Sequence, residues 1–316
     1  MQMNVLVTAI GSMSAQCVIK SLKKRGCLVV GCDIYPGDWH YETSLCDLFY
    51  QVPLATSNEY IDKLQSIVAK NDIDLIIPLT DVEVDCLNDR RDSFGKATIG
   101  LSPIEAISIA RNKYSLYEFF KEDKNVPSIP SFSTNDNLSC THFNDFPYIA
   151  KPQKGRSSEG LSSISSAQEL SLILEKPNYI IQKKIVGSVF TVDVVRQANS
   201  GKTIVIPRKE LLRTANGAGL TIQLSNDEKL KQLVCYIAEK LGINGCVNME
   251  FISVNGAYYL IDLNPRFSAG IAFSVLTGND LVDYHVSCFV GDNVIANAKE
   301  YNEIIVTKRF VESVLK

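Results

Sequence analysis

Residues 247–266 read VNMEFISVNGAYYLIDLNPR, two apolar runs joined by a Val-Asn-Gly turn at 254–256. This pattern predicts an antiparallel hairpin. Residues i and i+2 of a strand share a face, so Asp262 and Asn264 are expected to point the same way. If Glu250 lies opposite them, three oxygen-bearing side chains converge, and Mg²⁺ (or Mn²⁺) favours such ligands together with phosphate oxygens. The hairpin therefore predicts a site for a metal ion and a triphosphate.

The alternative is an ordinary hairpin with a solvated polar face, which Glu250 alone would fit. Asp262, Asn264 and Arg266 are poor sheet formers to find in one strand, and Pro265 must lie at an edge or an end of a strand. We therefore favour a binding site, in which three oxygen ligands lie beside the cation of Arg266.

A second segment offers groups that could bind phosphate. Residues 146–152 read FPYIAKP, a short expected strand that carries Lys151 and leads into the polar loop QKGRSSEG at 153–160. The glycines and serines of the loop let backbone N–H groups approach phosphate oxygens, and Lys151, Lys154 and Arg156 add positive charge. Taken alone, this segment would be interpreted as a basic hairpin turn.

The order of these segments resembles the ATP-grasp superfamily. Lys113 opens an amphipathic stretch and, taken alone, would be a solvated helix lysine. It is followed by Lys151 with its glycine-rich loop, by IIQKKIVG at 180–187, by Glu250 and by a D-x-N-x-R motif that ends at Arg266. The resemblance is to the branch typified by the carbamoyl-phosphate synthase large subunit and related carboxylate–amine ligases, and it covers nearly the whole chain.

The resemblance implies a role for each matching residue. The lysines would contact the nucleotide phosphates, the glycine-rich loop would close over them, and one arginine would contact the phosphate that is transferred. The implied nucleotide-binding residues are Lys113, Lys151, Gly155, Arg156, Ser157, Ser158, Gly160, Gln182, Lys183, Lys184 and Ile185; the implied metal ligands are Glu250, Asp262 and Asn264; and the implied catalytic residues are Lys151, Arg213 and Arg266.

One segment departs from the family pattern. Residues 181–185 match the hinge whose backbone N–H and C=O groups read the adenine edge in the family. Many relatives carry glutamates there in a pattern like QExIxGxE, whereas residues 182–189 read QKKIVGSV. The carboxylates that meet the adenine amine and the ribose hydroxyls are missing from the matching places. ATP is the expected nucleotide, while base selectivity and affinity stay open.

The region between hinge and hairpin lines the acceptor-substrate side in the family. An alternating strand is expected at 191–196 and a second at 204–210, followed by a loop at 214–219. By resemblance, Arg208 and Arg213 are expected to bind a carboxylate or an acyl phosphate, for which the planar guanidinium is suited because it pairs with two oxygens at once. The alternative is that both are surface strand arginines.

The N-terminal residues 1–102 show strand, helix, strand, helix and strand in turn, which predicts a doubly wound parallel α/β domain. Asp33 ends the second strand, where a dinucleotide fold would contact a ribose, yet the first turn lacks the G-x-G-x-x-G glycines. We therefore expect a scaffold and substrate wall, with Thr80, Asp81 and Glu83 at the strand end in the pocket. The expected strands are 4–10, 28–33 and 75–81, and the expected helices are 15–24 and 60–70.

The domain boundary is expected near residues 100–103, where a strand-like segment meets a Ser-Pro helix start. This gives a Rossmann-like pre-ATP-grasp domain at 1–102 and a two-lobed α+β ATP-grasp domain at 103–316. The lid subdomain would span about 125–185 and the metal-binding C-terminal lobe about 186–316.

Composition agrees with an enzyme of two or three domains. The 316 residues are 46% hydrophobic and carry a net charge of −3, so no nucleic-acid footprint appears. No apolar run approaches the roughly 20 residues that cross a bilayer, and residues 1–4 lack a basic leader, so we expect a cytoplasmic protein and no membrane. The nine scattered cysteines and three separated histidines are expected to be reduced thiols and to form no zinc site.

By resemblance, the expected function is that of an ATP-dependent ligase. ATP would convert a carboxylate into an acyl phosphate, which an amine attacks, with release of ADP and phosphate. Two alternatives stay open: phosphorylation of bicarbonate or carbamate, as in carbamoyl-phosphate synthesis, and a regulatory nucleotide-binding module without turnover. The expected partners are small-molecule carboxylate and amine substrates, with a homodimer left open, and the sequence does not identify the acid or the amine.

Overall fold

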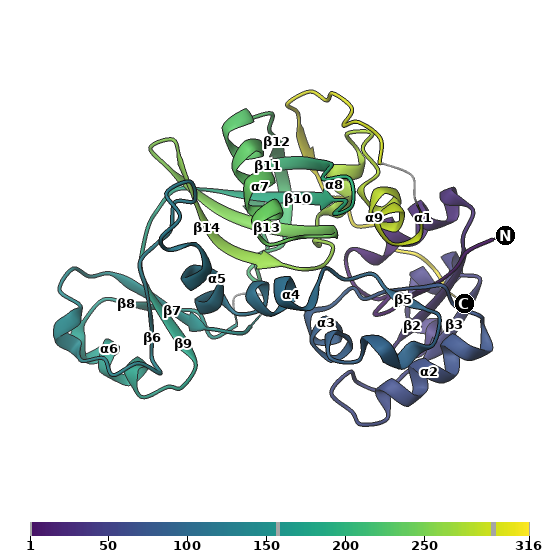
Figure 1. The fold of residues 1–316 in the computed structure, drawn as a ribbon, viewed down its shortest axis with the longest axis horizontal. Coiled ribbons are helices and arrows are strands. Elements are labelled where there is room, and N and C mark those ends of the chain that lie inside the picture. Colours follow the sequence, from purple (N-terminus) through teal and green to yellow (C-terminus); the bar gives the residue numbers. More distant parts are fainter. Residues whose placement is uncertain (1, 156–158, 292–294, 316) are drawn as a thin grey trace.

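The computed structural model describes residues 2–155, 159–291 and 295–315, and it contains three sheets (Figure 1). An N-terminal sheet of five strands and a small sheet of four strands lie at opposite ends of the molecule, with a body sheet of six strands between them. The expected fold class, a parallel N-terminal domain before a two-lobed unit, is confirmed. No helix among the described residues is long and apolar enough to cross a membrane.

The N-terminal sheet is wholly parallel, with the order β3-β2-β1-β4-β5. Its central strands are continuous apolar runs, as expected where helices cover both faces. Strand order reverses between β1 and β4, so the segments that follow these two strands meet at the switch point, where such sheets bind ligands. The elements are β1 (Asn4–Val7), α1 (Ala15–Arg25), β2 (Leu28–Asp33), β3 (Leu48–Gln51), α2 (Tyr60–Lys70), β4 (Leu75–Ile77), α3 (Asp81–Asn88) and β5 (Thr98–Ile99), with 3₁₀ turns at Gly37–Trp39, Tyr41–Leu45 and Arg91–Phe94.

Two predicted strands are shorter than expected. The first ends at Val7 rather than at residue 10, and the third ends at Ile77 because Pro78 has no N–H to donate. Asp81 therefore does not end a strand but begins α3, behind a capping box formed by Thr80 and Glu83. The strand β3 was not predicted at all.

The small sheet forms the lid subdomain and is antiparallel, with the order β6-β9-β7-β8. Helix α6 covers it, and Leu170 and Ile173 of that helix share an apolar cluster with Tyr148, Ile164 and Ile181 of the strands. The lid therefore has its own core. The elements are β6 (Ser131–Ser133), β7 (Tyr148–Pro152), β8 (Ser162–Ile164), α6 (Ala167–Leu174) and β9 (Tyr179–Lys183), with a 3₁₀ turn at Cys140–His142; α4 (Ile104–Ala110) and α5 (Lys113–Phe120) connect the lid to the N-terminal domain.

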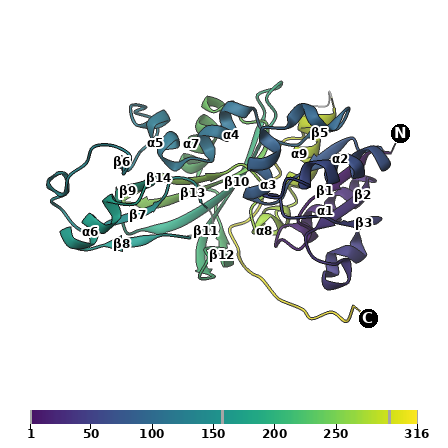
Figure 2. The same cartoon turned by 90° about the horizontal axis from the view of Figure 1, so that it is seen from below.

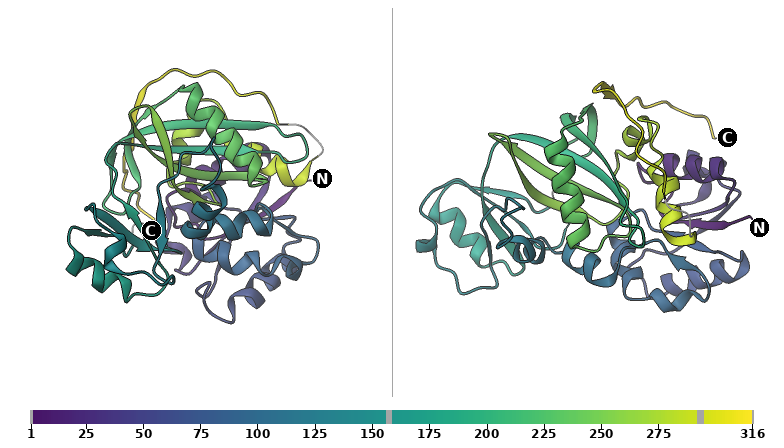
Figure 3. Two further views of the ribbon diagram at one scale, coloured as in Figure 1. Left: turned by 60° about the vertical axis from the view of Figure 1, so that its left-hand side comes forward. Right: turned by 45° about the horizontal axis from the view of Figure 1, so that its top comes forward.

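The body sheet has the order β14-β13-β10-β11-β12-β15. Alternate side chains of its strands point to opposite faces, so one face packs in the core and the other faces the site. Val192, Met249 and Phe251 point to one face, where they share a cluster with Leu230 and Val234 of α7. Figure 3 shows α7 lying across this face. The intervening residues of the same strands point to the opposite, polar face, which carries Thr191, Asp193, Asn248 and Glu250 next to the apolar Val195 and Cys246. The elements are β10 (Ser188–Arg196), β11 (Thr203–Arg213), β12 (Gly219–Leu224), α7 (Glu228–Lys240), β13 (Gly245–Val254), β14 (Ala257–Asn264), α8 (Ile271–Val275), α9 (Leu281–Val290) and β15 (Ile305–Thr307).

The C-terminal elements join the body to the N-terminal domain. Helix α9 packs on α1, and at this contact the Oγ of Ser21 donates to Asp280 at 2.6 Å. After α9 the chain forms β15, which pairs with β12 at the edge of the body sheet. The next residue, Lys308, donates from its Nζ to the backbone oxygen of Ala269 at 2.7 Å. Beyond it the chain runs extended on the side of the N-terminal domain (Figure 2).

A buried carboxylate also connects the two domains. Asp81 is 2% exposed and accepts from Arg111 at 3.1 Å and from Arg266 at 2.6 Å. Burial alone would raise the pKa of Asp81, but the two arginines outweigh it and hold the pKa below its usual value. Arg111 also pairs at 2.7 Å with Asp85, whose side chain is 47% exposed. Asp81, in the N-terminal domain, thus neutralises two cations from the other side of the domain boundary, Arg111 after α4 and Arg266 after β14.

We predict that Asp81→Asn lowers the free energy of unfolding by about 3 kcal/mol, because it leaves two enclosed guanidinium groups without a full counter-charge. The matched control is Asp85→Asn, which removes a half-exposed partner of the same arginine and should cost less than about 1 kcal/mol. Urea unfolding at neutral pH measures both. Equal losses in the two variants would contradict the special role of Asp81.

Candidate functional site

A cavity of about 620 Å³ lies where the N-terminal domain, the lid and the polar face of the body sheet meet. This volume is in the range of small-molecule sites. The N-terminal domain contributes the segments after β1 and β4, the lid contributes β7 and the end of β9, and the body contributes β10, β11, β13 and β14. All predicted site residues except five line it: Glu83, which lies elsewhere, Gly160, which is treated below, and Arg156, Ser157 and Ser158, which are outside the described residues.

The predicted hairpin is confirmed, and the metal site on it stays a prediction. In the register of β13 and β14, Glu250 is directly opposite Asp262, and Asn248 is opposite Asn264, so all four side chains share the polar face. The two-residue turn is tight because Asn255 and Gly256 have φ angles of 50° and 75°, as a type I′ turn requires. The hairpin therefore fixes two carboxylates and two amides on one patch of the cavity wall.

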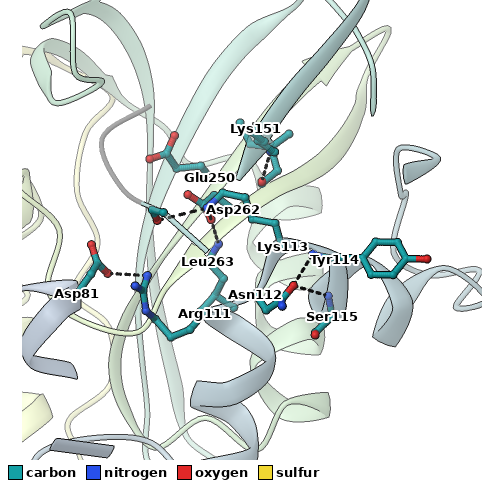
Figure 4. Close-up of polar contacts among 12 residues, drawn as sticks. Asp81, Arg111, Asn112, Lys113, Tyr114, Ser115, Lys151, Glu250, Asp262 and Leu263 are labelled. Atoms are coloured by element: carbon teal, nitrogen blue, oxygen red, sulfur yellow. Dashed lines mark hydrogen bonds and ion pairs between the residues drawn. The ribbon is translucent and has the colours of Figure 1, made fainter. Parts of the chain in front are cut away.

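Each carboxylate of the hairpin already has a cation beside it. Arg213 donates to Glu250 at 2.9 Å, and the Nζ of Lys113 lies 3.4 Å from Asp262 (Figure 4). Burial raises the pKa of Glu250 above its usual value, Arg213 opposes that shift, and the facing Asp262 adds to it. Two facing carboxylates favour a further positive charge between them.

The donor set fits Mg²⁺ rather than zinc. Among the described residues no group of three or more His, Cys, Asp or Glu side chains is arranged to hold a metal ion. Two carboxylates with the neighbouring amide of Asn264 are a set that Mg²⁺ uses when substrate phosphates supply the remaining ligands. The cysteines are free and scattered, as expected.

Lys151 is held over this patch by β7. Its Nζ donates to the backbone oxygen of Ile261 at 3.1 Å, and Figure 4 shows it near Glu250 and Asp262. Burial lowers the pKa of Lys151 to about 8, although the two carboxylates counteract the shift; Lys113 lowers it further. Such a pKa shows that the surrounding groups compensate the positive charge of Lys151 only in part, so an incoming anion would stabilise this charge.

Lys113 is positioned by the start of α5. The side chain of Asn112 caps this helix by accepting from the N–H groups of Tyr114 and Ser115 at 2.9 and 3.1 Å. The Nζ of Lys113 reaches the backbone oxygen of Gly155 at 3.5 Å. The helix start and the beginning of the glycine-rich loop therefore meet at one cation.

Gly160 lies at the other end of that loop. Its φ angle is 72°, and an added Cβ would lie 2.8 Å from Cγ of Pro152 and 2.9 Å from the hydroxyl of Tyr179. Only glycine satisfies both constraints. It is not among the residues that line the cavity, whereas Gly155, Glu159 and Leu161 are.

The expected hinge residues Gln182, Lys183, Lys184 and Ile185 all line the cavity. Both lysine side chains are directed to other groups of the lid: Lys183 pairs with Asp145 at 2.7 Å and Lys184 donates to Ser163 at 3.2 Å. The amide nitrogen of Gln182 donates to Ser131 at 2.7 Å, and its buried oxygen has no partner among the described residues. That oxygen is a free hydrogen-bond acceptor in the hinge segment, in which this chain lacks the carboxylates of the family pattern.

Arg208 is more enclosed than expected for an arginine that binds a substrate. Its side chain is 2% exposed, pairs with Asp193 at 2.6 Å and donates to Ser268 at 3.1 Å. It lies in the wall of the cavity, but most of its guanidinium is already engaged. The interpretation of Arg208 as a surface strand arginine is therefore wrong.

Glu83 is not a pocket residue. Its carboxylate accepts from the hydroxyl of Thr80 at 2.8 Å and from the buried hydroxyl of Tyr60 at 3.0 Å, inside the N-terminal domain. The expectation failed because the strand ends before residue 80, which turns Glu83 into the third residue of α3 and a partner of its cap.

Sequence analysis did not nominate Glu210, Asn248 or Arg111. The first two follow from the period of two: Glu210 shares a face with Arg208 on β11, and Asn248 shares a face with Glu250 on β13. Arg111 gave no signal, because only the packing of α4 against α3 reveals its bond with Asp81.

Comparisons with known proteins agree with these features. Residues 5–102 match the PylC-like N-terminal domain, and residues 110–270, half of the chain, match the ATP-grasp domain. The carbamoyl phosphate synthase large chain of Clostridium beijerinckii is 27% identical over 164 residues, which are 46% of this chain and 15% of that protein. The arginine-specific large chain of Halalkalibacterium halodurans is 23% identical over 273 residues, 80% of this chain and 25% of that protein. The chain thus spans a quarter or less of the length of these curated relatives.

Solved structures show the same fold at low identity. The biotin carboxylase domain of the Hydrogenobacter thermophilus 2-oxoglutarate carboxylase, in complex with MgADP, ADP and bicarbonate, matches with a TM-score of 0.79 at 16% identity, over 96% of this chain and 74% of that chain. The N5-carboxyaminoimidazole synthetase of Staphylococcus aureus, in complex with ADP, matches with a TM-score of 0.74 at 16% identity, over 93% of this chain and 79% of that chain.

We predict that Lys151→Met stabilises the protein at neutral pH by roughly 1–3 kcal/mol, because it keeps the packing and removes a charge whose folded pKa is depressed. The folded pKa of about 8 is below the unfolded value of 10.5. Between these values the unfolded wild type binds more protons at this position than the folded one, so the stability of the wild type relative to the variant should rise with pH.

Urea unfolding from pH 7 to pH 10.5 measures this difference. The control is Lys154→Met, an exposed lysine of the same segment, which should change stability by less than about 0.5 kcal/mol. A Lys151→Met protein that is less stable than wild type at pH 7 would argue against a strained ammonium.

Proposed function

The chain belongs to the ATP-grasp family, and we propose that it is an ATP-dependent ligase that activates a carboxylate as an acyl phosphate for attack by an amine, with release of ADP and phosphate. One observation carries this proposal. The cations of Lys113, Lys151 and Arg213 converge with Glu250 and Asp262 on one wall of a single cavity. Such a mixed set is suited to a magnesium polyphosphate, which carries charges of both signs.

The nucleotide would lie between the lid and the body sheet. Its phosphates would displace Asp262 as the partner of Lys113 and the backbone oxygen of Ile261 as the partner of Lys151, which lie at 3.4 and 3.1 Å. Glu250, Asp262 and Asn264 would hold Mg²⁺, which supplies charge neutralisation on phosphate oxygens. The base would lie at Gln182–Ile185, where the buried oxygen of Gln182 could accept from an exocyclic amine.

The protein's own contribution is positioning and charge, because phosphoryl transfer leaves little covalent work to the enzyme. Arg266 would contact the transferred phosphoryl group. Its Nη2 is fixed at 2.6 Å from the buried Asp81, while its Nε is buried without a partner among the described residues. Arg213, which reaches the metal-binding wall from β11, would bind the acid or the acyl phosphate. Enclosure between lid and body would protect the acyl phosphate from water.

Phosphorylation of bicarbonate or carbamate is a second candidate. It is favoured by the curated relatives, which are carbamoyl phosphate synthase large chains, and by the bicarbonate bound in the 2-oxoglutarate carboxylase structure. Bicarbonate-dependent ADP release without any other acid would establish this second function. A regulatory module would bind Mg²⁺-ATP and release no ADP.

Association into a homodimer and a cytoplasmic location are further proposals, which sedimentation and cell fractionation test.

The decisive experiment is a screen of amino acids, sugar acids and bicarbonate for ADP release in the presence of amines. With the substrate found in this screen, Asp262→Asn and Glu250→Gln should each reduce turnover by a factor on the order of 10² or more while the fold stays intact. Loss of a group that stabilises charge in the transition state has an effect of this size. Circular dichroism and thermal unfolding verify the fold. Turnover within a few-fold of wild type in both variants would place the metal elsewhere.

The next prediction concerns the protonation of Lys151 when Mg²⁺-ATP binds. The pKa of Lys151 is about 8, and nearby phosphates should raise it, so Mg²⁺-ATP binding at about pH 8.5 should take up a fraction of a proton. At about pH 6.5 the lysine is protonated before and after binding, and no uptake from this group is expected. Calorimetry in buffers of different ionisation enthalpy measures the uptake.

The matched variant is Lys151→Arg, whose guanidinium stays charged at both pH values and should abolish the uptake even if affinity falls. The same uptake in wild type and variant would show that another group titrates.

A further inference from the structure

We propose that the cavity contains a subsite for a primary ammonium group at Glu210, on the side of the polar face that is remote from the metal-binding hairpin. The inference rests on the proposed function and deepens it, because it states that one of the two organic substrates carries an aliphatic amine in its charged form. An amino acid and an alkylamine share this chemistry, and the experiment below distinguishes them.

Glu210 is a buried acid with unused hydrogen-bonding capacity. It lies on β11, its side chain is 2% exposed, and it lines the cavity. Its Oε2 is buried and has no hydrogen-bond partner among the described residues. A buried carboxylate without a partner is costly, and its presence beside a cavity points to a donor that arrives with a ligand. Rotation of the carboxylate about its last torsion can present either oxygen.

The cations next to Glu210 are committed to other groups. Arg208 pairs with Asp193 at 2.6 Å, whereas its Nε is 3.5 Å from the Oε1 of Glu210 and makes no hydrogen bond. Lys308 donates to the backbone oxygen of Ala269 at 2.7 Å. Both cations stabilise a negative charge at this position, but neither donates a hydrogen bond to the carboxylate of Glu210.

The other enclosed acids of the cavity are already assigned. Asp81 accepts from two arginines, at 3.1 and 2.6 Å. Glu250 and Asp262 face each other across the hairpin, with Arg213 and Lys113 beside them. Among the described residues that line the cavity, Glu210 is therefore the enclosed carboxylate that is left for an organic cation.

Glycines pack closely against this acid and its neighbouring arginine. An added Cβ at Gly219 would lie 2.4 Å from the Oε2 of Glu210, and one at Gly270 would lie 2.8 Å from Nη2 of Arg208. A side chain at either position would collide with the carboxylate or the guanidinium. The wall around the proposed subsite is thus built from backbone and small side chains, namely Gly217, Ala218, Gly219, Ala269 and Gly270.

The position also suits the reaction. Strand β10 lies between β11 and β13, and its register places Arg208 across from Glu250, so the backbone of Glu210 is two strand spacings and two residues, roughly 12 Å, from that of Glu250. A carboxylate activated near the metal and an ammonium held at Glu210 would both fit within that span. The ammonium would donate N–H groups to the carboxylate in a charge-assisted hydrogen bond, which is short and roughly twice as strong as a neutral one.

The test uses matched compounds and the isosteric variant Glu210→Gln, with Glu175→Gln on the exposed end of α6 as the control for the same chemical change. Acids are supplied in pairs with and without the amino group: L-alanine and propionate, L-glutamate and glutarate, L-phenylalanine and 3-phenylpropionate. Hydroxylamine is the nucleophile, and ADP release is measured. In a second arm, 1,3-diaminopropane, propylamine and hydroxylamine are compared as nucleophiles for the best acid, because only the diamine can attack with one nitrogen while the other is held as an ammonium. Binding of the same compounds to the protein with Mg²⁺ and a non-hydrolysable ATP analogue is measured by calorimetry.

If the acid carries the ammonium, Glu210→Gln should raise the KM of the amino members about tenfold or more and change the des-amino members less than about twofold. If the nucleophile carries it, the increase should appear for 1,3-diaminopropane and not for propylamine or hydroxylamine. Equal effects on amino and des-amino members, or no effect of the variant in either arm, would overturn the subsite.

A complete lack of ADP release would refute the proposed ligase rather than this inference, because the calorimetric readout does not need turnover. In that case tighter binding of amino members to wild type, lost in Glu210→Gln and kept in Glu175→Gln, supports the subsite. Equal binding by both proteins, or no binding of any amino compound, overturns it. Retained binding of the nucleotide analogue shows that the variant is folded.

Discussion

Two carboxylates, Glu250 and Asp262, face each other on adjacent strands, and much of the site follows from that arrangement. Like charges directly opposite in a sheet are destabilising unless positive charge compensates them. The fold brings this charge from two directions, Arg213 from the same sheet and Lys113 from the start of α5. Lys151, on strand β7 of the lid, lies near both carboxylates. Its lowered pKa shows that they compensate its positive charge only in part. The site is therefore a set of charges that protein partners satisfy only in part, and binding of a metal polyphosphate would complete it.

The N-terminal domain enters this arrangement through one residue. Asp81 begins α3 at the switch point of the parallel sheet and holds Arg266 by its Nη2, while Arg111 from α4 binds the other oxygen of the same carboxylate. A domain that lacks the glycines for a dinucleotide thus still has a ligand-facing edge, and it uses that edge to orient an arginine of its neighbour. Scaffold and site are connected by a single buried acid.

The parts of the fold that the sequence predicted are those in which one local pattern decides the outcome. The hairpin turn and the alternation around Glu250 require nothing from the rest of the chain, and the helix at 60–70 and the strand at 28–33 were right at both ends. Errors arose where tertiary context decides. The strand at 75–81 was too long because the cap of α3 competes with strand pairing, and Glu83 moved out of the pocket with it. Glu210 was missed because its importance lies in the lack of a partner, which only packing reveals.

The pairing of β15 with β12 has a consequence for the integrity of the body sheet. Without β15, the outer side of β12 would expose unpaired N–H and C=O groups, and open edges of this kind recruit strands from other molecules. The residues that cover the edge are continuous with Lys308, which is bonded to Ala269 in the cavity wall. Protection against self-association and the shape of the cavity wall therefore depend on one short segment, and proteolysis ahead of Ile305 would disturb both together.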